Sequence, residues 1–135
     1  MQLCRFNDDR LGLVRDGQVL DVSSALQVLP TCTYPLPRHD PLVAHLPAVR
    51  AAIDRLIADG VRLARHRLED VRLLSPVANP GKVVAAPVNY AKHLQEARDD
   101  AAIHHQNQVG EIQRVGLFLK ATSSVVGASA GVAIA

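Results

Sequence analysis

The sequence predicts an α+β fold, and three observations along the chain lead to this class. Residues 2–22 alternate apolar and polar side chains, as half-buried strands do. Residues 47–59 repeat apolar side chains at helical spacing. A stretch rich in Pro and Gly begins at residue 76 and punctuates the chain. We therefore expect an N-terminal α+β domain over residues 1–75 and a second segment over residues 76–135.

The N-terminal domain is expected to begin with three strands, near residues 2–6, 11–15 and 18–22. Asp16 and Gly17 separate the second strand from the third. Both central positions of a type I′ turn require positive φ, and an Asp-Gly pair accepts that conformation. The sequence therefore predicts a tight β-hairpin at this point.

Helices are expected to follow the hairpin. Asp21 or Ser23 can cap a short helix that runs to Leu29, because short polar side chains accept hydrogen bonds from the first free N–H groups. A longer helix is expected to start after Asp40 and to be regular over residues 47–59.

The second segment is expected to combine short strands with one helix. Residues 71–74, just ahead of it, and residues 116–120 have the pattern of strands, and residues 82–86 have that of a fully buried strand. Asn89 is expected to cap a helix that runs from Tyr90 to about residue 99.

Composition excludes several classes of function. Fifteen basic residues against thirteen acidic ones give a net charge of +2, and aromatic residues make up only 3%. This balance does not favour binding to nucleic acid or to an anionic membrane, and no apolar run is long enough to span a bilayer. Cys4 and Cys32 lack metal-site spacing, so we expect free, buried thiols in a reducing cytoplasm.

His93 and Glu96 form the first candidate site, because residues three apart on a helix lie on one face. A carboxylate that accepts from one imidazole nitrogen leaves the other nitrogen free to take a proton from water. The alternative is an exposed pair without a role, which is common on helix surfaces. Spacing alone favours that alternative.

Lys120 is the second candidate, because it ends a predicted strand and hydroxyl residues follow it. An ammonium group in that place can hold a substrate carboxylate, although a surface lysine with no role is the simpler interpretation. His104 and His105 are adjacent, but no acidic or cysteine cluster accompanies them at metal-ligand spacing. No metal ligands are predicted in this chain.

Three stretches carry a resemblance to a known family. They read LCRFNDDRLGLVRDGQVLDV, NYAKHLQE and LFLKATSSVVG, and they occur in this order along nearly the whole chain. The chain resembles the N-terminal part of fumarylacetoacetate hydrolase family proteins. Its likeness is greatest to the bacterial branch often named 2-keto-4-pentenoate hydratase or 2-oxohepta-3-ene-1,7-dioate hydratase.

The resemblance implies a small N-terminal domain followed by a catalytic domain of mixed, rolled β-sheet. It implies a hydrolase or lyase of aromatic catabolism that acts on a 1,3-dicarbonyl or a 2-oxo acid, by C–C hydrolysis, hydration or decarboxylation through a metal enolate. The metal in the full-length family is Mg²⁺ or Ca²⁺, held by acidic residues downstream. His93 and Glu96 match the family's catalytic dyad, while Lys120 and Tyr90 match positions near the substrate. Residues 97–115 resemble a lid over the substrate.

The chain departs from the family pattern at the metal site. The family's acidic ligands follow the LFLK segment, whereas Glu111 is the last acidic residue here. The sequence thus resembles a truncated member whose catalytic domain is incomplete, and we expect this chain alone to hold no metal and to be inactive. Whether it acts in an enzyme or is a non-catalytic remnant with a fold or interaction role stays open. A homodimer or a complementing C-terminal polypeptide would be its partner, with a small oxo acid as substrate.

Overall fold

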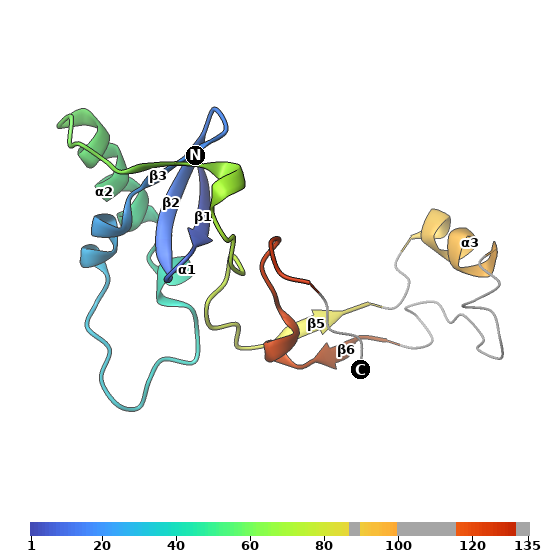
Figure 1. The fold of residues 1–135 in the computed structure, drawn as a ribbon. Helices are drawn as coiled ribbons and strands as arrows, with labels where there is room; N and C mark the ends of the chain where they lie inside the picture. Colours follow the sequence, from blue (N-terminus) through green and yellow to red (C-terminus); the bar gives the residue numbers. More distant parts are fainter. Residues whose placement is uncertain (87–89, 100–115, 132–135) are drawn as a thin grey trace. The chain divides into compact units, whose positions relative to one another are not determined.

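The computed structural model describes residues 1–86, 90–99 and 116–131. These residues divide into two compact units, coloured along the chain in Figure 1. The first unit contains Met1–Gly81 together with the residues from Val125 onward, and the second contains Lys82–Ser124. The expected division into domains over 1–75 and 76–135 stays a prediction.

A four-stranded antiparallel sheet forms the centre of the first unit. Its strands are β1 (Gln2–Phe6), β2 (Arg10–Arg15), β3 (Gln18–Asp21) and β4 (Arg65–Arg67), in the spatial order β1-β2-β3-β4. The first three confirm the strands expected from the alternating pattern. Their order is the simplest that short hairpin connections allow.

The turn between β2 and β3 has the conformation that the sequence predicts. Asp16 has φ of 49° and Gly17 has φ of 71°. Arg15 and Gln18 face each other directly across the turn, so it is a two-residue hairpin loop. This fixed register places Leu13 opposite Leu20 on one face of the sheet.

The strand expected at residues 71–74 is wrong. Only an isolated bridge forms there, between Leu73 and Phe6, and the fourth strand is β4 instead. The apolar pattern at this point reflects burial and not membership of a strand: the Val71 side chain is 6% exposed and packs against the sheet. A short 3₁₀ turn, η2 (Leu68–Asp70), lies between β4 and Val71.

Two helices of the first unit confirm the expected longer helical stretch. They are α1 (Pro41–Ala44) and α2 (Leu46–Ala58). Asp40 caps α1, since its side chain accepts a hydrogen bond from the Leu42 N–H at 2.9 Å. Val49, the first buried residue of α2, faces the core of the unit.

The short helix after the hairpin differs from the expectation in type and cap. It is a 3₁₀ helix, η1 (Ser23–Val28), and neither Asp21 nor Ser23 is its N-cap, a position that Val22 holds without a side-chain hydrogen bond. Asp21 instead accepts hydrogen bonds from the Ser23 N–H and Oγ and from Arg10. Burial acts to raise the pKa of Asp21, but these hydrogen bonds and the charge of Arg10 outweigh it and lower the pKa.

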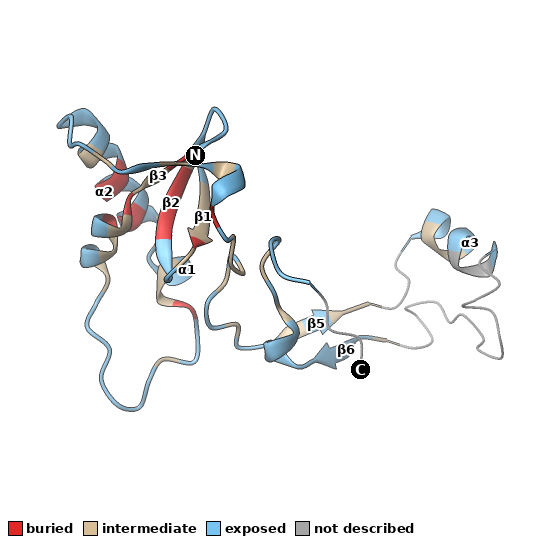
Figure 2. Ribbon diagram, viewed as in Figure 1, coloured by how far each residue is buried: buried red, intermediate tan, exposed pale blue. Residues whose placement is uncertain are grey.

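The core of the first unit lies on both faces of the sheet. On one face β2, η1 and α2 pack together around residues such as Leu11, Ala25 and Ile53. On the other face Phe6 and Val19 pack with Val71. Figure 2 shows these buried residues gathered on the strands and on α2. Apolar side chains therefore pack on both faces of the sheet.

The expected burial of the two thiols is only partly right. Cys4 lies half-buried on the sheet, where burial raises the pKa of its thiol and a hydrogen bond with the Gly12 backbone opposes that shift. Cys32 is exposed in the Pro-rich connection that precedes α1. Local apolar neighbours in the sequence do not decide burial in an irregular loop, because loops run over the surface.

The second unit contains a two-stranded antiparallel sheet and one helix. The strands are β5 (Val83–Ala85) and β6 (Phe118–Lys120), the helix is α3 (Ala91–Asp99), and a 3₁₀ turn, η3 (Thr122–Ser124), follows β6. The helix confirms the expectation. The expected burial of residues 82–86 is wrong, because Val84 is 52% exposed. The lid expected over residues 97–115 lies outside the described residues, apart from the end of α3.

No helix of the described residues is both long enough and apolar enough to cross a membrane.

Candidate active site

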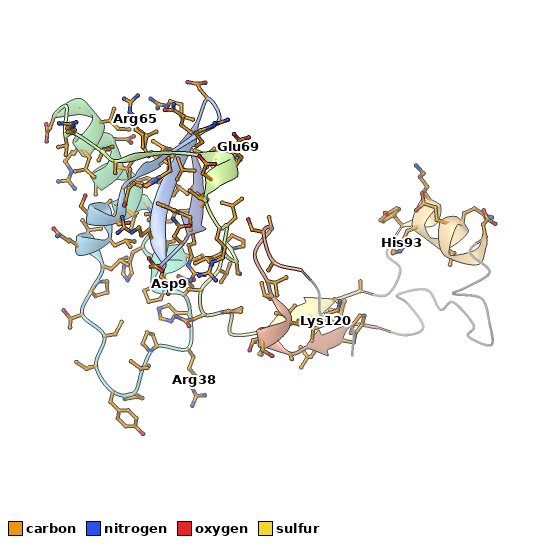
Figure 3. The ribbon with its side chains drawn as sticks, viewed as in Figure 1. Asp9, Arg38, Arg65, Glu69, His93 and Lys120 are labelled. Carbon is orange, nitrogen blue, oxygen red and sulfur yellow. The ribbon has the colours of Figure 1, made fainter. Side chains whose placement is uncertain are left out.

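Three of the four candidate site residues lie on or next to α3. Tyr90 precedes the helix, and its carbonyl accepts a hydrogen bond from the Leu94 N–H at 3.1 Å. His93, labelled in Figure 3, lies on the helix itself, and Glu96 follows it by three residues on the same helix. Asn89, the expected cap, lies outside the described residues.

His93 lies against Tyr90 in this structure. The ring centroids are 5.2 Å apart and the ring planes are inclined by 36°, a usual arrangement for an aromatic pair. Tyr90 is 57% exposed, so the contact leaves the phenol open to solvent. The Tyr90 ring therefore lies beside the imidazole at the start of α3.

Glu96 lies nearest to a lysine on the same helix. Its Oε1 is 3.7 Å from Lys92 Nζ, and both side chains are largely exposed, so the pair contributes on the order of 0.3 kcal/mol at most. Within residues 90–99, the structure shows no hydrogen bond or ion pair between Glu96 and His93. The expected dyad is therefore not formed here, although its one-turn spacing is present, and it stays a prediction.

Lys120 ends β6 and pairs across the ladder with Val83. Its Nζ lies 5.7 Å from the centroid of the Phe118 ring, within the range of a cation–π contact. The hydroxyl of Ser124, one of those expected beside the lysine, donates to the Ala121 carbonyl at 2.7 Å. Lys120 is exposed, so its ammonium group can bind a carboxylate. The Ser124 hydroxyl, in contrast, already donates its hydrogen bond to the Ala121 carbonyl.

The described residues do not fit a metal site. Over residues 1–86, 90–99 and 116–131, no three His, Cys, Asp or Glu side chains gather closely enough to hold an ion. A hard divalent cation needs several oxygen ligands, and most of the acidic groups described here lie singly or in ion pairs. His104, His105 and Glu111 lie outside the described residues.

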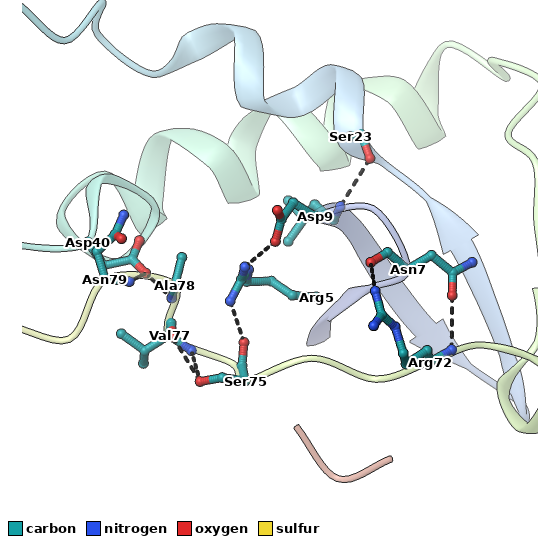
Figure 4. Close-up of polar contacts among 11 residues, drawn as sticks. Arg5, Asn7, Asp9, Ser23, Asp40, Arg72, Ser75, Val77, Ala78 and Asn79 are labelled. Atoms are coloured by element: carbon teal, nitrogen blue, oxygen red, sulfur yellow. Dashed lines mark hydrogen bonds and ion pairs between the residues drawn. The ribbon is translucent and has the colours of Figure 1, made fainter. Parts of the chain in front are cut away.

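Sequence reasoning missed a polar network that joins the start of the sheet to residues 75–79 (Figure 4). Arg5 donates to the Ser75 carbonyl at 2.8 Å and pairs with Asp9. Asp40, which is buried at 6% exposure, accepts from the Ala78 N–H at 2.6 Å. The cap position of Asp40 is readable from the sequence, but its second partner is 38 residues away and carries no local signal.

Comparison with known proteins gives close relatives. No family model matches the chain. Maleylpyruvate hydrolase from Aquipseudomonas alcaligenes is 54% identical over 99% of this chain, which spans 46% of that protein. The crystal structure of maleylpyruvate hydrolase from Sphingobium sp. SYK-6, in complex with manganese(II) and pyruvate, is 31% identical with a TM-score of 0.59. The match covers 93% of this chain and 39% of that one.

A second crystal structure of the Sphingobium sp. SYK-6 enzyme agrees, at 30% identity and a TM-score of 0.61 over 93% of this chain and 40% of that one. The chain therefore spans less than half the length of the relatives that it matches. The resemblance to the family is confirmed, through relatives named maleylpyruvate hydrolase and not through the hydratases of the expected branch. The chain is a homologue of maleylpyruvate hydrolase and belongs to the fumarylacetoacetate hydrolase family.

Proposed function

We propose that this chain is one part of a metal-dependent hydrolase that cleaves a C–C bond in a 2-oxo acid or 1,3-dicarbonyl of the maleylpyruvate type. The observation that carries the proposal is the 54% identity to a maleylpyruvate hydrolase over 99% of the chain. The manganese and pyruvate in the Sphingobium structure support a divalent cation and a small oxo acid as ligands of the whole enzyme. A cytoplasmic location is part of the proposal and agrees with two free thiols.

His93 is the proposed general base, which takes a proton from water as the water attacks the substrate. Glu96 is the proposed positioning residue, and it reaches His93 by a side-chain rotation away from Lys92, because residues three apart share a helix face. A carboxylate on one imidazole nitrogen holds the tautomer in which the other accepts a proton.

Lys120 is the proposed partner of a substrate carboxylate. Its ammonium group is exposed at the end of β6, and a charge-assisted hydrogen bond to a carboxylate is roughly twice as strong as a neutral one. Tyr90 is proposed to limit where the imidazole can lie, through the ring contact described above. The described residues of this chain offer no set of ligands for the metal.

The chain alone is proposed to be inactive. Isothermal titration of the purified 135-residue chain with Mn²⁺ or Mg²⁺ should show no binding at micromolar concentration. Incubation with maleylpyruvate or another acylpyruvate should leave the substrate unchanged. Metal-dependent turnover by the chain alone that disappears in His93→Ala would overturn this part of the proposal.

A second candidate is a non-catalytic remnant of the family with a fold or interaction role. The lack of a cluster of metal ligands among the described residues favours it. The two candidates differ when the rest of a related hydrolase is supplied. Only the first expects turnover that depends on His93.

A further inference from the structure

A groove lies in the first unit where α2 ends, between the residues that follow the helix and the open end of the sheet. It has a volume of about 780 Å³, within the range of small-molecule sites in proteins. Leu20 and Ile57 form an apolar floor over Leu13, which is only 2% exposed, and Arg15, Arg62 and Arg65 stand around it. We call these six residues the arginine-rimmed groove.

Strand register explains why Arg15 and Arg65 lie on the same face of the sheet as Leu13 and Leu20. Leu20 lies opposite Leu13 on one side and opposite Arg65 on the other, and directly paired residues project to the same face. Arg15 follows Leu13 by two residues, so it projects to that face as well. Arg65, labelled in Figure 3, thus lies on the side of the sheet that α2 packs against.

The helix leaves this end of the face uncovered. α2 ends at Ala58, and Gly60, with φ of 64°, turns the chain back toward the sheet. Ile57 and Val61 remain 37% and 46% exposed. Two large apolar side chains are therefore open to solvent beside arginines, and the groove can contact both an apolar body and negative charge.

The three arginines are available for a ligand. In the described part of the chain, none of Arg15, Arg62 and Arg65 forms an ion pair, whereas Arg10 and Arg67 each pair with a carboxylate. None of the residues that line the groove is acidic. Guanidinium groups bind carboxylates through paired hydrogen bonds, so the groove has the charge and the donors for an organic anion.

We propose that the arginine-rimmed groove binds a small organic anion with carboxylates at both ends of an apolar carbon body. Arg15 and Arg65 are on strands separated by β3 and are staggered by two residues along it, so their Cα atoms are about 12 Å apart. Two carboxylates at that separation can each meet an arginine while the carbon chain lies on Leu20 and Ile57. The inference does not depend on the proposed hydrolase function.

Titration of the ¹⁵N-labelled 135-residue chain with azelate, a linear nine-carbon dicarboxylate, tests the proposal by NMR. Amide shifts should concentrate on Leu13, Leu20 and residues 60–65. Malonate has the same charges without the apolar body, and dimethyl azelate has the body without the charges. Both should bind at least about tenfold more weakly, because each retains only one kind of contact. No azelate binding, or malonate binding equal to it, would overturn the proposal.

The double variant R62Q/R65Q should weaken azelate binding by at least about tenfold while the chain keeps its fold, since both side chains are exposed. R38Q is the matched control, because Arg38 is an exposed arginine on the loop before α1, away from the groove (Figure 3). It should change the affinity less than about twofold. Equal weakening by R38Q would mean that only the general charge of the chain matters, and the proposal would fail.

Discussion

Replacement of Asp40 should destabilise the first unit more than its place in a loop would suggest. The side chain is 6% exposed, and its two oxygens serve different segments. Oδ1 accepts from the Leu42 N–H at 2.9 Å and so caps α1. Oδ2 accepts from the Ala78 N–H at 2.6 Å, with a weaker contact to Asn79 at 3.4 Å. One carboxylate thus joins two parts of the chain 38 residues apart.

The size of the effect follows from these contacts. Loss of a helix cap costs about 1 kcal/mol. Loss of the charge-assisted hydrogen bond from the Ala78 N–H costs about 2 kcal/mol. Asp40→Ala should therefore lower the free energy of unfolding by about 3 kcal/mol. Asp40→Asn keeps one acceptor oxygen and should lose about half of that.

Urea denaturation followed by circular dichroism measures both variants. Asp54→Ala is the matched control, since Asp54 is exposed on α2, and it should change the free energy of unfolding by less than about 0.5 kcal/mol. An Asp40→Ala variant as stable as Asp54→Ala would refute the idea that this carboxylate joins the two segments. An Asp40→Asn variant as stable as the unchanged chain would show that one oxygen suffices.

Three further predictions concern the sheet, its pH dependence and its dynamics. Gly12→Ala should lower stability by about 2 kcal/mol in urea denaturation, because an added Cβ would lie 2.4 Å from Val19 Cγ1; an unchanged midpoint would contradict this. The lowered pKa of Asp21 stabilises the fold above the ordinary Asp value of about 3.9, and this is lost as pH falls through the lower folded value. Asp21→Asn should therefore flatten the unfolding free energy against pH in that window, and an unchanged acid slope would count against it. Amide hydrogen exchange should be slow in the core up to residue 60 and fast in α3 and β6, and equal protection of these elements would contradict the packing.

The sequence predicted those strands and turns that depend only on residues close together in the chain. The first three strands and their turn follow from alternation and from two residues that accept positive φ. β4 could not be predicted, because its residues are Arg-His-Arg and it forms through backbone pairing with β3. Residues 71–74 show the converse, since Val71 and Leu73 pack in a core although the segment forms only one isolated bridge.

The candidate site was predictable in spacing but not in pairing. One helical turn between His93 and Glu96 follows from sequence alone. Which neighbour each side chain meets depends on competing partners, and here Lys92 and Tyr90 are nearer than the dyad partner. The arginine-rimmed groove left no sequence signal, because its arginines come from β2, β4 and the segment after α2.

A chimera tests the central claim most directly: this chain replaces the matching 136-residue stretch of the Aquipseudomonas alcaligenes maleylpyruvate hydrolase. Its turnover of maleylpyruvate is measured with Mn²⁺ present. We expect turnover that falls at least about 100-fold in His93→Ala and survives in Lys92→Ala. An inactive but folded chimera, or one whose turnover is unaffected by His93→Ala, would contradict the claim that this chain carries the catalytic base.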